Sequence, residues 1–199
     1  MQLPSKYILD RESIKQNTYR LVCLFYANKE ISRNTDPGNR NSGIAKLEDS
    51  FFFSEFSRLL IEIAISIRVL DDQMMSLSEE STIKKNYLDA KTEVNNSYNC
   101  MMFDEMNLRE VCNKIIHADV VEPHLQEVEN DGHDIDNINW LGWSESVEQS
   151  GEDVIPEPEP IKWMFLTNNV RLGGKNRGQQ WWHLLEIPLF VEAISELLA

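Results

Sequence analysis

Three polar side chains recur at four-residue steps near the middle of the sequence: Arg109, Asn113 and His117, within LREVCNKIIHA. In a helix, residues at this spacing share one side, so the three side chains form a stripe about 80° wide. A guanidinium holds phosphate, an imidazole exchanges a proton near neutral pH, and an amide orients either one. The row therefore suits phosphodiester chemistry, with His117 as acid/base, Arg109 as phosphate anchor and Asn113 as positioner. The same spacing also arises on ordinary exposed helix faces.

A helix predicted over residues 102–118 carries this row. Its apolar face is formed by Leu108, Val111, Cys112, Ile115 and Ile116. Two longer helical patterns precede it. One begins near Asp10, a potential cap, and reaches about Ile31. The other covers about 46–74 and is apolar on nearly every side between Phe51 and Leu70, so we expect other helices to surround it. Residues 76–99 are polar and predict either a mobile, exposed connection or a weak helix.

The predicted central helix carries a second polar stripe, formed by Glu55, Arg58, Glu62 and Ser66 at spacings of three and four. Glu62 has two interpretations: it pairs with Arg58 in its own helix, or it orients Arg109 or His117 from the neighbouring helix. Arg58 and Glu62 are therefore candidate supporting residues. Arg68 and the pair Asp71 and Asp72 project elsewhere, and we expect them to mark the exposed end of the helix.

The segment LREVCNKIIHA, together with the upstream SRLLIEIAISIRVLDD, resembles the HEPN superfamily of small helical proteins over about residues 10–120. In that family an Arg, often followed directly by Asn, precedes a His by four to six residues. Asn113 and His117 match the Asn and the His. Cys112 stands in the usual position of the Arg, and Arg109 lies about one turn earlier. A long guanidinium side chain at that place is a candidate substitute.

The resemblance implies a HEPN-like helical bundle and a metal-independent endoribonuclease of a bacterial toxin or defence system. The implied reaction is attack of an RNA 2′-hydroxyl on the adjacent phosphate, which leaves a cyclic phosphate. It also implies a homodimer in which two motif helices face each other. The alternative is a noncatalytic HEPN-like module for dimerisation or for binding a protein partner, including an antitoxin-like one.

The C-terminal region predicts two strands, 161–170 and 179–187, joined by the loop RLGGKNRG, and then a helix begun at Pro188. Arg171, Lys175 and Arg177 make this loop a candidate phosphate-binding segment, although a glycine-rich hairpin loop is the more common explanation. Trp163, Trp181 and Trp182 are expected to pack the strands against the helices, with base stacking as the alternative.

The fold class expected is α+β, mainly α. Residues 1–120 form the helical bundle, 121–160 an acidic, proline-containing linker or excursion, and 161–199 a hairpin and helix that pack on the bundle. The net charge is −14, yet 13 carboxylates lie between Asp119 and Glu159, which leaves 20 acidic against 19 basic residues elsewhere. A nucleic-acid partner is therefore not excluded by charge.

Composition favours a cytoplasmic protein with no membrane segment. The N-terminus lacks a leader pattern, no apolar run is long enough for a bilayer, and the three cysteines are widely spaced. No metal or other cofactor is expected. The four histidines are scattered, and the calcium-like loop EVENDGHDIDNI has Ile138 where a bidentate Glu belongs.

Overall fold

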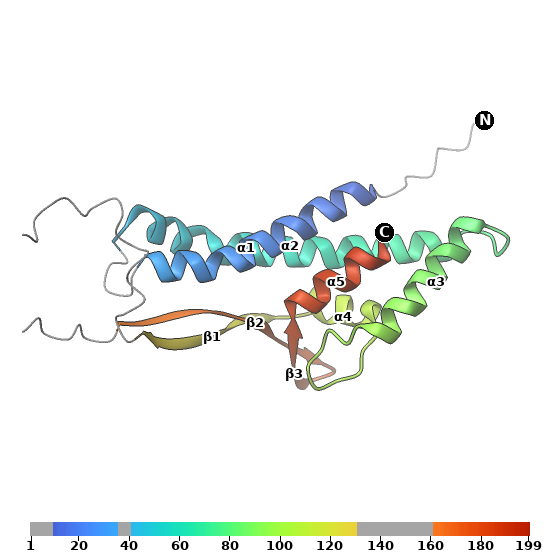
Figure 1. Cartoon of the computed structure of the whole chain (residues 1–199). Coiled ribbons are helices and arrows are strands. Elements are labelled where there is room, and N and C mark those ends of the chain that lie inside the picture. Colours follow the sequence, from blue (N-terminus) through green and yellow to red (C-terminus); the bar gives the residue numbers. More distant parts are fainter. Residues whose placement is uncertain (1–9, 36–40, 131–160) are drawn as a thin grey trace, which may run out of the picture.

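The computed structural model describes residues 10–35, 41–130 and 161–199, which form five helices and a three-stranded sheet (Figure 1). In chain order the elements are α1 (Arg11–Asn34), α2 (Gly43–Met75), α3 (Thr82–Ser97), α4 (Leu108–Ile116), β1 (Val120–Asn130), β2 (Ile161–Asn176), β3 (Gln179–Glu186) and α5 (Ile187–Leu197). The fold is α+β and mainly helical, as the sequence predicts. None of these helices is both long and apolar enough to cross a membrane.

The two longest helices, α1 and α2, lie side by side along the molecule (Figure 1). Asp10 caps α1 as predicted, because its carboxylate accepts a hydrogen bond from the backbone amide of Glu12 at 3.0 Å. Ser42 does the same for α2. Between the helices, Phe25 packs on Phe56 with ring centroids 6.2 Å apart. This buried seam is the first part of the hydrophobic core.

The shorter helices close the core around one half of α2. The polar segment after α2 forms α3, which docks one side through three buried side chains, Lys84, Tyr87 and Val94. Helix α4 is shorter than the predicted 102–118, because Asn107 and Glu110 form a reciprocal capping box that fixes its start. Helix α5 has Pro188 in its first turn, as expected.

The sheet has the order β1-β2-β3, antiparallel throughout. Strand β1 corrects the expectation that a linker begins at residue 121: it pairs with β2 from Val120 to Asn130. An edge strand tolerates the acidic residues and the proline that suggested a linker, and the register shifts between Pro123 and Leu125. The remainder of the expected linker, 131–160, lies outside the described residues.

Strand β2 also extends further than predicted. The segment RLGGKN belongs to the strand, and the loop to β3 is only Arg177 and Gly178. Their φ angles are 51° and 84°, which is the conformation of a two-residue turn that matches the twist of paired strands. The predicted eight-residue loop was therefore wrong, since only its last two residues leave the ladder.

One side chain of α1 joins the helices to the sheet. The amide of Asn28 accepts a hydrogen bond from the backbone N–H of Leu166 in β2 at 3.0 Å and donates one to Glu48 of α2 at 2.6 Å. Asn28 is buried, so both ends of its amide are satisfied inside the fold. This bridge fixes β2 against the α1–α2 pair.

Among the described residues, helices α1, α3 and α4 contact α2 but leave one side of it open, which corrects the expectation that other helices surround it. Its N-terminal half packs mainly on α1, and α4 covers part of its C-terminal half. Large apolar side chains such as Phe51 and Ile65 therefore remain exposed on its outer side. The continuous apolar pattern reflects two faces, of which only one belongs to the core of the described residues.

Candidate functional site

The motif helix α4 and its C-cap His117 present Arg109, Asn113 and His117 toward the surface, whereas the apolar face is buried except for the partly exposed Ile116. Cys112 lies on that buried side with no exposed surface. Burial raises the pKa of its thiol well above the ordinary range, so the thiol stays protonated. A side chain at position 112 therefore faces the core, and a charged Arg there would have no access to solvent in this arrangement.

At the first turn of α4, Arg109 is bound by two carboxylates of α2. It pairs with Asp71 and, through Nη2, with Asp72 at 2.8 Å. These hydrogen bonds raise the pKa of Arg109 above its ordinary value. The space beside this cluster measures about 10 Å³, room for a single water at most. Arg109 is thus held in a structural ion pair with two carboxylates, and the enclosed space beside Asp71 does not admit a phosphate.

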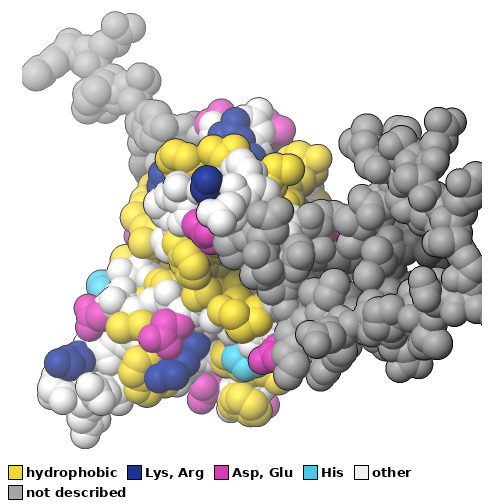
Figure 2. Space-filling view, turned by 90° about the vertical axis from the view of Figure 1, so that its left-hand side faces the viewer, with side chains coloured by type: hydrophobic (Ala, Val, Ile, Leu, Met, Phe, Trp, Pro, Cys, Tyr) yellow, Lys and Arg dark blue, Asp and Glu magenta, His cyan; other side chains and the backbone are white. Residues whose placement is uncertain are grey.

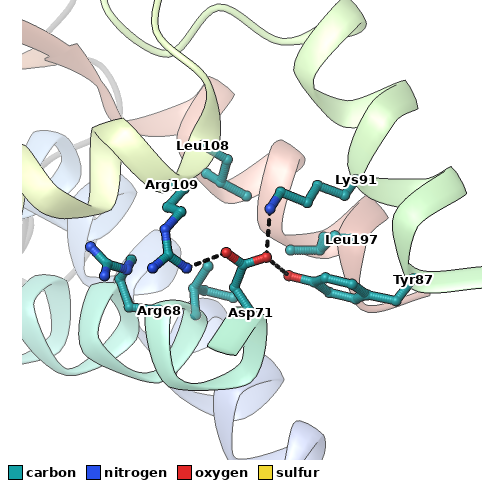
Figure 3. Close-up of a pocket in the computed structure, with 8 residues that line it drawn as sticks. Arg68, Asp71, Tyr87, Lys91, Leu108, Arg109 and Leu197 are labelled. Carbon is teal, nitrogen blue, oxygen red and sulfur yellow. Dashed lines mark hydrogen bonds and ion pairs between the residues drawn. The ribbon is translucent and has the colours of Figure 1, made fainter. Parts of the chain in front are cut away.

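Asp71 is the centre of this cluster (Figure 3). It is only 3% exposed, and it accepts hydrogen bonds from Lys91 at 2.6 Å, from Tyr87 at 3.1 Å and from Arg109. Burial alone would raise the pKa of Asp71, but the bonds from Lys91 and Arg109 outweigh it and lower the pKa. The carboxylate stays ionised and joins α2 to α3 and α4.

At the other end of α4, a surface depression of about 590 Å³ opens beside His117. Asn113 and His117 line it from the motif helix, and Lys175 lines it from β2. Lys114 also lies there, with its ammonium 4.5 Å from the ring centre of Trp181. Within the described residues, the side chains of His117 and Lys175 carry no hydrogen bond or ion pair. The depression thus brings together an imidazole, two amides (Asn113 and Asn176) and two ammonium groups, with Asp119 as the one acidic group in its lining.

The glycines of the predicted phosphate loop have a packing role. A Cβ on Gly173 would lie 2.1 Å from the ring of Trp182, and one on Gly174 would lie 2.4 Å from the ring of Trp181. These indoles of β3 lie directly over the glycines paired with them. Trp181 packs partly against the core, as expected, whereas Trp182 remains exposed. The paired glycines therefore make room for the indoles.

Of the three cations in that segment, only Lys175 reaches the depression. Arg171 lies over the ring of Trp182 at 3.9 Å and pairs with Glu122 at 3.6 Å. Arg177 occupies the hairpin turn. The predicted phosphate-binding trio is therefore not gathered in one place in this structure.

The predicted supporting pair stays within its own helix. Arg58 binds Glu55 at 2.7 Å and Glu62 at 2.5 Å, and Glu62 also accepts a hydrogen bond from Asn17 of α1 at 3.1 Å. Neither residue contacts the motif helix. Of the two interpretations given for Glu62, the pairing with Arg58 is confirmed.

Asp71, Lys91 and Tyr87 are the residues that sequence reasoning missed. Asp71 was expected at an exposed helix end, yet it is buried and accepts hydrogen bonds from three side chains. The signal available was its position: Asp71 follows Ile67 by four residues and so lies on the buried side of α2, while Asp72 points outward. The described residues contain no group of three or more metal-ligating side chains.

In comparisons with protein-family models, curated proteins and solved structures, nothing matches this chain. The HEPN-like relationship consequently remains a prediction from the residues of the motif helix and of α2. The contacts of those residues provide the basis for a functional proposal.

Proposed function

We propose that this chain is a noncatalytic HEPN-like module that binds another protein chain. One observation carries the proposal: the guanidinium of Arg109, the expected phosphate anchor, is held by the two carboxylates Asp71 and Asp72, whose charges exceed its own. A phosphate is therefore repelled there unless Arg109 leaves the pair, and leaving would take a partner from the buried Asp71 at a cost of several kcal/mol.

The position of the usual family Arg supports the same proposal. Cys112 faces the core, so no cation stands there to neutralise a phosphate. An exposed apolar surface on α2 offers the module an alternative use, since large contiguous apolar patches mark protein interfaces more often than catalytic sites.

A second function, the metal-independent endoribonuclease of a bacterial toxin or defence system, is favoured by a different observation. Asn113, His117 and Lys175 share the depression at the end of α4 although they come from segments far apart in the sequence. In this variant Lys175 would hold the phosphate in place of Arg109, and His117 would remove the proton from the 2′-hydroxyl. The depression is open enough to admit a nucleotide.

Incubation of the purified chain with end-labelled mixed RNA in the presence of chelator separates the two functions. The module predicts no new fragments bearing cyclic phosphate. The nuclease predicts fragments that vanish in both His117→Ala and Lys175→Ala. His124→Ala is the matched control, because His124 is also exposed but lies on β1, outside the lining of the depression. Cleavage that His117→Ala abolishes and His124→Ala preserves would overturn the noncatalytic proposal.

A further inference from the structure

One side of α2 carries large apolar side chains that remain exposed in the described structure. They recur at steps of three and four residues, interrupted by Ser54 and Arg58, and each is 38–61% exposed. We call this row the outer seam; its members are Ile44, Leu47, Phe51, Ile61, Ile65 and Val69. In Figure 2 hydrophobic side chains reach the surface over the upper part of the molecule, where the helix pair lies.

The spacing of the outer seam is that of a helix that packs lengthwise on another helix. Alternating steps of three and four keep side chains on one narrow line, which is how paired helices interdigitate. Helix α2 has 33 residues and is about 50 Å long. Phe53 and Met75 of α2 are also exposed but lie outside this row. The length of the helix and the alignment of the row favour one long helix as the occupant over a compact or irregular partner.

The row has a symmetry that identifies the other helix. Phe51 and Ile65 each lie seven residues from Arg58, and Leu47 and Val69 each lie eleven residues from it. When two copies of α2 run antiparallel with a two-fold axis at Arg58, Phe51 of each meets Ile65 of the other, and Leu47 meets Val69. Each of these four apolar groups then has an apolar counterpart, which is the self-complementarity that a two-fold interface requires. The two other members lie opposite carboxylates: Ile61 opposite Glu55, and Ile44 opposite Asp72.

The centre of the row tolerates this arrangement. Arg58 is paired with Glu55 and Glu62 of its own helix, so neither guanidinium reaches the axis without a partner, and the cluster carries a net charge of −1 per copy. A polar group at the centre of an apolar helix pair also fixes register, because a slip would bury it against apolar side chains.

The exposed area is sufficient for a specific pair. Six side chains of this kind at these exposures present on the order of 500 Å² per copy, so two copies would bury about 1,000 Å², where specific interfaces begin. The flanking charged side chains add to that area.

We propose that the outer seam is a homodimer interface, in which the α2 helices of two copies pack antiparallel around Arg58. This inference rests on the proposed protein-binding function and names its partner. It also differs from the dimer that the family resemblance implies. Asp71, which binds α4, lies about 120° around α2 from Ile65, so the two motif helices would not face each other.

A charge exchange tests both the interface and its direction. We would measure the molar mass of the full chain by analytical ultracentrifugation across a concentration series, for the unaltered protein, Phe51→Lys, Ile65→Asp and the double variant. The unaltered chain is expected to be a dimer. Each single change should weaken the dimer at least tenfold, because it buries an unpaired charge. The double variant should recover, since the opposite charges then meet across the pair, whereas within one helix they are 14 residues apart.

Phe103→Lys is the matched control, since Phe103 is 82% exposed but lies outside the seam, and it should leave the dimer unchanged. Circular dichroism confirms that each variant folds. A monomeric unaltered chain would overturn the inference, as would a dimer insensitive to the single changes or a double variant weaker than both, which would indicate parallel pairing. RNA cleavage in the preceding experiment would instead refute the noncatalytic function. The molar mass would still decide whether the outer seam is a dimer interface.

Discussion

The two ends of α4 place their polar side chains in opposite environments. At the first turn Arg109 faces Asp71, which is buried and also bound by Lys91 and Tyr87. At the last turn His117 faces an open depression that it shares with Lys175. The residue types are those of one functional row, but a buried carboxylate lies beside only one end. The neighbouring element, and not the spacing along the helix, therefore decides which of these side chains remain available for binding.

Removal of the buried carboxylate should have the largest effect on the free energy of unfolding. Asp71→Asn should destabilise the fold by about 3 kcal/mol, because Lys91 and Arg109 lose their anionic partner in a largely buried place. Asp72→Asn is the matched control: the Asp72 side chain is 61% exposed, so its loss should cost about 0.5 kcal/mol or less. Urea unfolding at pH 7 measures both. Equal effects of the two changes would show that Asp71 is not the centre of the cluster.

The difference in free energy of unfolding between the unaltered chain and Asp71→Asn should depend on pH. The folded pKa of Asp71 lies below the value of about 3.9 for an unperturbed Asp, so its stabilisation is fully present above that pH. It is lost as the pH falls through the folded pKa, because the carboxylate is then protonated in both states. Urea unfolding at pH 7, 5 and 3 should therefore give the same difference in free energy of unfolding at pH 7 and 5 and a smaller difference at pH 3. Narrowing already between pH 7 and 5 would mean that burial raises the pKa.

On the depression side, backbone packing should matter more than the exposed charges. Gly174→Ala places a methyl group against the ring of Trp181 and 2.9 Å from the carbonyl oxygen of His117, so we expect a loss of about 2 kcal/mol. Gly43→Ala is the control, because a Cβ there meets nothing within 4 Å, and it should be neutral or slightly stabilising. Thermal unfolding compares them. A neutral Gly174→Ala would contradict the role assigned to the paired glycines.

Removal of the exposed side chains of the depression should have the smallest effect on stability. His117→Ala and Lys175→Ala should each change the free energy of unfolding by less than about 0.5 kcal/mol, because both side chains are exposed and carry no bond in the described structure. The same urea measurement applies. A loss as large as that of Asp71→Asn would show that the depression is a structural cluster rather than an open site.

Local chemistry made part of this fold predictable. Asp10 correctly predicted the start of α1, and Pro188 predicted the start of α5. The tryptophan-rich segment correctly predicted a strand. In each case the signal and the structure lie within a few residues of each other. The same holds for the pairing of Arg58 with Glu62, which depends only on helical spacing.

The parts that were mispredicted depend on distant residues. Asp71 reads as an exposed helix end until α3 and α4 supply its partners from 16 and 38 residues away. Gly173 and Gly174 suggested a loop in the sequence, because only the register with β3 shows that an indole lies over each of them. Strand β1 is too acidic for a core strand, and only its edge position explains it. Composition records none of these neighbours.

The bridge from Asn28 to Leu166 has a consequence for synthesis of the chain. The two residues are 138 positions apart, so the helix pair is translated long before the strand that completes the Asn28 amide. Until then Asn28 has only its bond to Glu48, and the side of α1 destined for the sheet stays uncovered. Completion of the fold is therefore late on the ribosome, and contacts of such long range slow it further. We expect nascent chains that lack β2 to be the forms that chaperones bind.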